Sequence, residues 1–65
     1  MSVVSVKNKY EGQLLSIPGV VGVFADVGRN RLVVLVENAT DCQRLPAMIE
    51  GYAVECRVSG RASAL

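Results

Sequence analysis

The sequence has no histidine and no tryptophan, and among its 65 residues only two are cysteines and only three are aromatic. Without histidine, the serines and Thr40 lack the usual base that activates a hydroxyl nucleophile. Two cysteines supply at most half of a tetrahedral zinc site, and the spacing of Cys42 and Cys56 matches no zinc-finger pattern. The sequence therefore predicts no enzyme, no catalytic residue and no metal or cofactor site.

An excess of charge and a long apolar run are also missing. The net charge is +1, whereas nucleic-acid-binding domains are usually strongly basic, so no nucleic-acid partner is expected. No apolar run reaches the roughly 18 residues of a membrane span, so no membrane partner is expected either. The start, Met1 to Val6, lacks the charged and apolar regions of a secretory signal, which predicts a cytoplasmic protein.

Apolar residues are abundant, at 51% of the chain against 20% charged residues. Twelve are valines, whose branched Cβ packs well on a pleated sheet. We expect one small domain over residues 1–65, because a chain this short buries only about 60% of its unfolded surface. Such a domain commonly needs a covalent staple or a partner. A homo-oligomer, most simply a dimer, is therefore expected, with an unknown protein partner as a further possibility.

A helical period opens the chain. The apolar residues fall three or four apart, which places them on one face of a helix: Val3, Val6, Tyr10, Leu14 and Ile17. Ser2 precedes them as a candidate N-cap. An alternative makes Ser2–Lys7 a strand followed by a shorter helix, because valine is a poor helix former. One helix is preferred because the period holds across the whole segment.

Two strands and a turn follow Pro18-Gly19, which ends the helix. Residues 20–27 alternate as a strand, with Val21 on the same face as Val23. The turn at residues 28–30 contains Gly and Asn, which tolerate positive φ. Residues 32–36 are apolar on both faces, which indicates a central strand that is covered on both sides or lies at an oligomer interface.

The second half predicts a short helix and a last strand. Thr40 and Gln43 fit a capping box, and Pro46 should end or kink the helix that they start. Gly51 is expected to be its C-terminal cap. Residues 52–59 alternate, and the predicted inward residues are Tyr52, Val54, Cys56 and Val58.

These elements predict an α+β fold in the order α-β-β-α-β, with a small, mainly antiparallel sheet and both helices on one face. If residues 2–7 form a strand instead, the fold becomes a ferredoxin-like β-α-β-β-α-β unit. Without that strand, the slot beside residues 32–36 is either closed by residues 52–58 or offered to another chain. An open strand edge is a pairing template.

The remaining polar residues give weak signals. Cys56 reads best as a small buried free thiol, while a disulfide between Cys42 and Cys56 is an alternative that is unusual in a reducing cytosol. The six carboxylates lie on separate elements and read as solvated charges. The arginines near the turn and the last strand form only a sparse basic surface: Arg29, Arg31, Arg57 and Arg61.

Four segments carry a family resemblance: IPGVVGV, LVVLVEN, LPAMIEGYAVE and GRASAL. Together they resemble a group of short uncharacterised prokaryotic proteins, many archaeal, with the order PGVVGV…VVYVE…IEGxPVE…G…AL. A similar segment lies ahead of the catalytic domain in some trypsin-like protease homologues. A looser resemblance to heavy-metal-associated domains lacks their defining pair of cysteines.

The sequence thus favours a non-enzymatic interaction module that works as a homodimer or docks on a larger protein. The resemblance implies an alternative, a folding aid or inhibitor of a protease, in which the tail Arg61–Leu65 lies extended in a cleft. Metal handling and nucleic-acid binding are less favoured still.

Overall fold

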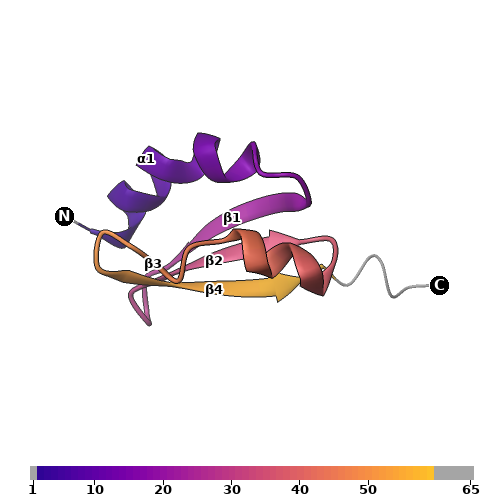
Figure 1. Cartoon of the computed structure of the whole chain (residues 1–65). Helices are drawn as coiled ribbons and strands as arrows, with labels where there is room; N and C mark the ends of the chain where they lie inside the picture. Colours follow the sequence, from indigo (N-terminus) through magenta and orange to yellow (C-terminus); the bar gives the residue numbers. More distant parts are fainter. Residues whose placement is uncertain (1, 60–65) are drawn as a thin grey trace.

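A computed structural model describes residues 2–59 of the chain (Figure 1). One helix, a four-stranded sheet and a short 3-10 helix make up these residues. In chain order the elements are α1 (Val3–Leu15), β1 (Val20–Asp26), β2 (Arg31–Val36), η1 (Ala39–Arg44), β3 (Met48–Ile49) and β4 (Tyr52–Val58). The predicted α+β class is confirmed.

Helix α1 begins where the sequence predicts it. The Ser2 hydroxyl accepts a hydrogen bond from the backbone N–H of Ser5 at 3.2 Å and so caps the helix. The predicted apolar face is confirmed, since Val3, Val6 and Leu14 are buried and Tyr10 and Ile17 pack beside them. The alternative strand over residues 2–7 is wrong, because the helical period extends unbroken from residue 3.

The strand order is β1-β2-β4-β3. β1 runs antiparallel to β2, β4 runs parallel to β2, and β3 runs antiparallel to β4. The last strand therefore takes the slot beside β2, so that slot is closed within the chain and is not offered to another. The ferredoxin-like alternative does not form, since its first strand would need this position.

A β-bulge interrupts β1. The register with β2 shifts between Val20 and Gly22, so that Val20 packs against the core while Val21 is exposed. An extra residue in one strand reverses the faces on one side of the bulge. The prediction that Val21 shares the face of Val23 is therefore wrong. The turn after β1 forms as expected, with Asn30 at φ 54° and the Arg29 N–H donating to Asp26 Oδ1 at 3.2 Å.

The crossover from β2 to β4 begins two residues before the predicted cap. Asn38 is the N-cap of η1, and its backbone N–H donates to Asp41 Oδ2 at 3.1 Å. The Thr40–Gln43 capping box is wrong, because a carboxylate three residues after Asn38 provides the same reciprocal bond. As predicted, the helix ends before Pro46, with Leu45 already extended.

Strand β3 was not expected from the sequence. It pairs with the start of β4 across a tight turn, in which Glu50 and Gly51 both have positive φ, at 50° and 87°. This is the backbone pattern of a hairpin turn. Gly51 therefore serves the β3–β4 turn, and its predicted role as a helix C-cap is wrong.

Cys42 and Cys56 form a disulfide that links η1 to β4. The preferred interpretation of Cys56 as a free buried thiol is wrong, and the disulfide alternative holds. The two Cα atoms lie 5.8 Å apart, a separation that a disulfide spans readily. Because Cys56 packs against the core, the bond places η1 on the same side of the sheet as α1.

The core lies between this helical layer and the sheet. Its fully buried side chains are Val6, Leu32, Val34 and Val36. Alternate residues of β2 thus point to α1 and η1, as period-2 alternation requires. On β4 the predicted inward residues Tyr52, Val54 and Cys56 pack against the core, whereas Val58 is 49% exposed.

Candidate functional site

The second face of the sheet has no covering layer within residues 2–59, because α1 lies on the first face (Figure 1) and the disulfide to Cys56 holds η1 on the same side. Strand alternation and register assign its residues. We call this surface the open face, and its residues are Gly22, Phe24, Asp26, Arg31, Val33, Leu35, Met48, Ala53, Glu55 and Arg57. Residues 32–36 are apolar on both faces, as predicted. Val33 and Leu35 therefore lie on the open face, which has no second layer within the described residues.

Three rows of side chains cross the open face, because neighbouring strands are in register. The Asp26 row contains Asp26, Arg31, Ala53 and Met48. The Phe24 row contains Phe24, Val33 and Glu55, and the Leu35 row contains Gly22, Leu35 and Arg57. The apolar residues of the last two rows come from β1 and β2, and the charged ones come from β4.

Phe24 is the aromatic side chain of the open face. A Cβ placed on Gly22 would lie 3.4 Å from Cε2 of Phe24 and 3.5 Å from Cδ1 of Leu35. The aromatic ring therefore lies over Gly22 and close to Leu35, and it leaves 53% of the residue exposed. Val33 beside it is buried, yet it does not belong to the core cluster on the other side. Together they form an apolar patch on β1 and β2.

An ion-pair network borders this patch on β4. Glu55 receives a bond from Arg31 Nη1 at 3.2 Å and another from the Nε of Arg57. The hydrogen bond from Arg57 is the main cause that lowers the pKa of Glu55, and the bond from Arg31 acts in the same direction against desolvation. The network keeps Glu55 ionised on a surface that is otherwise partly apolar.

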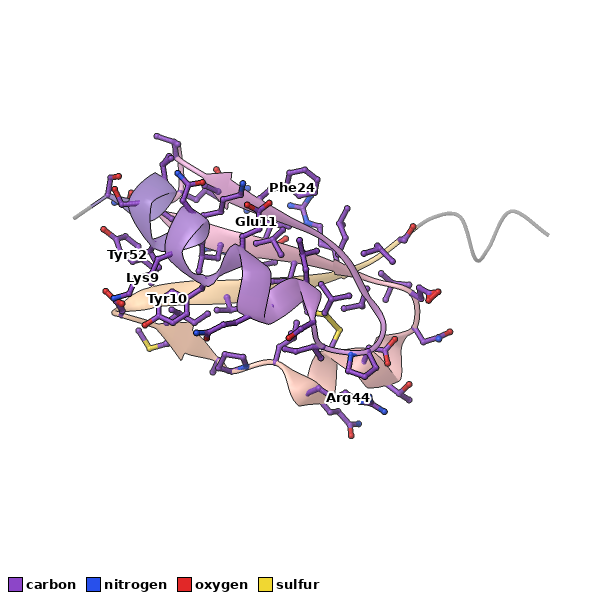
Figure 2. All side chains as sticks on the ribbon, turned by 90° about the horizontal axis from the view of Figure 1, so that it is seen from above. Lys9, Tyr10, Glu11, Phe24, Arg44 and Tyr52 are labelled. Atoms are coloured by element: carbon purple, nitrogen blue, oxygen red, sulfur yellow. A yellow bond between two sulfur atoms is a disulfide. The ribbon has the colours of Figure 1, made fainter. Side chains whose placement is uncertain are left out.

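A second polar cluster joins α1 to the β3–β4 turn. Glu50 Oε2 accepts hydrogen bonds from Lys9 Nζ at 2.9 Å and from the Tyr10 hydroxyl at 2.7 Å. Figure 2 shows Lys9 and Tyr10 on α1, away from Phe24. The bonds to Glu50 raise the pKa of both Lys9 and Tyr10, so neither is activated as a nucleophile or base near neutral pH. The cluster therefore fixes the turn to the helix.

The other candidate residues do not come together. Arg29 is exposed in the β1–β2 turn and Arg44 ends η1, whereas Arg31 and Arg57 both bind Glu55. Arg61 and the rest of the tail lie outside the described residues. Cys42 and Cys56 carry no free thiol. Within residues 2–59, no three side chains of the metal-binding types gather into a group, and no helix is long and apolar enough to cross a membrane.

The acidic residues are spread over separate contacts, as the sequence predicts, but the interpretation of all six as solvated charges is wrong for Asp41, which is buried at the start of η1. Glu11 pairs with Lys7 one turn earlier at 3.1 Å. Asp26 accepts from the turn backbone and Asp41 from the backbone N–H at the start of η1. Glu37 is exposed directly after β2.

Comparison with known proteins identifies no relative, since no family model, curated protein or solved structure matches the chain. The sequence identified the apolar second face of β2, whereas the position of the Phe24 ring over Gly22 is seen only in the structure.

Proposed function

We propose that the chain is a non-enzymatic protein-interaction module that works as a homodimer. One observation carries the proposal: the open face holds an apolar patch, with Phe24 53% exposed, and no second layer within the described residues. Exposed apolar surface gains free energy when it leaves water, by about 25 cal/mol per Å². A second copy supplies the missing layer.

The size of the domain supports self-association. A two-layer domain of 65 residues has room for one small core, here between α1 and the sheet. Sheets with an apolar second face are typically covered by helices or by another sheet. A second copy has the same uncovered face, so each copy covers the open face of the other.

The charges of the open face also permit self-association. Asp26 and Glu55 balance Arg31 and Arg57, so that two copies do not repel each other through a net charge on this face. An acidic or basic partner gains no long-range attraction from it. The balance favours a self-complementary contact over a strongly charged partner.

We propose that the protein is located in the cytoplasm. A disulfide such as Cys42–Cys56 is uncommon in that compartment outside hyperthermophiles. Alkylation of thiols in intact cells, followed by mass spectrometry, tests the location and the bond together. Recovery of the oxidised chain from an extracytoplasmic fraction alone would contradict the proposed location.

The self-association itself is tested by sedimentation velocity over a concentration series from low micromolar to near millimolar. We expect a species of twice the chain mass that dissociates on dilution. A chain that sediments as a monomer across the whole series would contradict the proposed function.

A further inference from the structure

The geometry points to a specific arrangement of the homodimer, and this inference rests on the self-association proposed above. Two copies pack their open faces together about a two-fold axis that runs across the strands. The axis passes between the Phe24 row and the Leu35 row. The product is a four-layer molecule, helices outside and two sheets about 10 Å apart inside.

The outer edge of β1 is the first alternative contact, since among the described strands β1 pairs with β2 alone. Its seven residues contain the bulge between Val20 and Gly22, which breaks the regular ladder that a second strand would need. Bulges are a common way to protect edge strands from pairing. The opposite edge, β3, has only two residues. The face is therefore the better surface for a second copy.

The two-fold axis brings apolar side chains together at the centre. It exchanges the two central rows, so Val33 of one copy lies opposite Leu35 of the other. Phe24 lies opposite Gly22 of the other copy, over which the Phe24 ring of that copy already lies. Residues two apart on a strand are about 7 Å apart, so the two Phe24 rings come near each other across the axis.

The same axis places side chains of opposite charge from the two copies opposite each other, around the apolar centre of the contact. Glu55 of one copy lies opposite Arg57 of the other, because these residues occupy the two exchanged rows. Arg31 lies opposite Glu37, which directly follows β2, two residues beyond Leu35, and whose backbone N–H still bonds to Gly19 beside β1. The axis repeats each pairing, which gives four cross-copy contacts between opposite charges.

Another axis, along the strands between β1 and β2, stacks β1 of one copy on β2 of the other. That arrangement covers the apolar patch but leaves β4 outside the contact, and it places Glu37 far from Arg31 of the second copy. The axis across the strands covers three strands and explains why charges of both signs border the patch. Glu37 therefore distinguishes the two arrangements.

Two substitutions and two matched controls test the inference by sedimentation equilibrium. Phe24→Glu changes the centre of the contact, and Val4→Glu makes the same kind of change on α1 at a residue that is 42% exposed. Glu37→Arg places like charges opposite each other, and Glu11→Arg changes the net charge equally on α1. Circular dichroism establishes that each variant is folded. If Phe24→Glu does not fold, Phe24→Gln is used in its place.

We expect Phe24→Glu to raise the dimer Kd at least ~30-fold, as loss of a central aromatic anchor does. Glu37→Arg should raise it ~10-fold through like-charge repulsion. Both controls should dimerise like the parent. If the parent is a dimer and Phe24→Glu dimerises equally well, the surface is wrong while self-association stands. If only Glu37→Arg has no effect, the axis is wrong. If the parent is a monomer, the proposed function itself fails.

Discussion

The carboxylate of Asp41 occupies the space that a side chain at Gly19 would need. A Cβ built on Gly19 overlaps the carboxyl group, and Gly19 itself has φ 95°. Asp41 is 8% exposed, and it accepts a hydrogen bond from the Asn38 backbone. The loop before β1 and the first turn of η1 therefore fit together only with glycine at this position.

Gly19→Ala should destabilise the fold by about 2 kcal/mol or more, because both the φ angle and the Asp41 contact resist a methyl group. Gly12→Ala is the matched control. Gly12 lies in α1 with nothing within 4 Å of its added Cβ, and alanine there should stabilise the fold by up to about 1 kcal/mol. Denaturant unfolding measures both changes. Equal stability of the two variants would contradict this account.

The sequence predicts local structure better than long-range pairing. The helical period predicts α1, and the Pro18-Gly19 pair predicts where it ends. The position of β4 beside β2 depends on the path of residues 37–51, which no periodicity encodes. The choice of N-cap also depends on long-range contacts. Asn38 and Thr40 are both good N-cap residues, and the cap at Asn38 uses the Asp41 carboxylate, which packs against Gly19 in the loop before β1.

Removal of the disulfide should cost about 3 kcal/mol, since the cross-linked cysteines are 14 residues apart and the bond restricts the unfolded chain. The variant is the double change Cys42→Ser and Cys56→Ser, and thermal unfolding measures the loss. Reductant should lower the Tm of the parent by a similar amount and leave the double variant unchanged. A parent that melts at the same temperature with and without reductant contradicts the prediction.

Acid should weaken the fold through Glu50 and Glu55. Both have a folded-state pKa below the ordinary 4.5, so their contribution is present above that pH and is lost as the pH falls below it. Glu50→Gln should flatten the fall in unfolding free energy on the acid side. Glu11→Gln is the control, since the carboxylate of Glu11 pairs with Lys7 one turn earlier on the same helix. An unchanged acid slope in Glu50→Gln would contradict the role of this cluster.

Alkali should weaken the fold through the partners of Glu50. The pKa values of Tyr10 and Lys9 are raised above the ordinary 10.0 and 10.5, so their contribution is present below those values and is lost as the pH rises through the raised ones. Denaturant unfolding from neutral to strongly alkaline pH measures the loss. Tyr10→Phe should show a shallower fall than the parent, and an equally steep fall would count against the contact.

Val34→Ala should destabilise the fold by about 1–3 kcal/mol, because the side chain is fully buried and its truncation leaves a void. Val4→Ala is the control, since Val4 is 42% exposed on α1. Chemical unfolding of both variants measures the difference. Similar stability of the two would mean that β2 is not the central strand of the core.

The sequence predicts only part of the open face. The apolar residues on both faces of β2 predicted a covered strand or an interface, and Val33 and Leu35 do lie on the second face. Alternation after Gly22 also places Phe24 on this face, but its exposure needed the structure, because the sequence does not show which face of the sheet the helices leave uncovered. The pairing of charges across an axis needed the register of three strands.

The most direct test of the proposed dimer is an isotope-filtered NOE experiment on a mixture of labelled and unlabelled protein. It detects only protons that are close across the two copies. We expect cross-peaks from the Phe24 ring of one copy to the methyl groups of Val33 and Leu35 of the other. No cross-peak at near-millimolar concentration, or cross-peaks confined to α1, would contradict the claim that a second copy covers the open face.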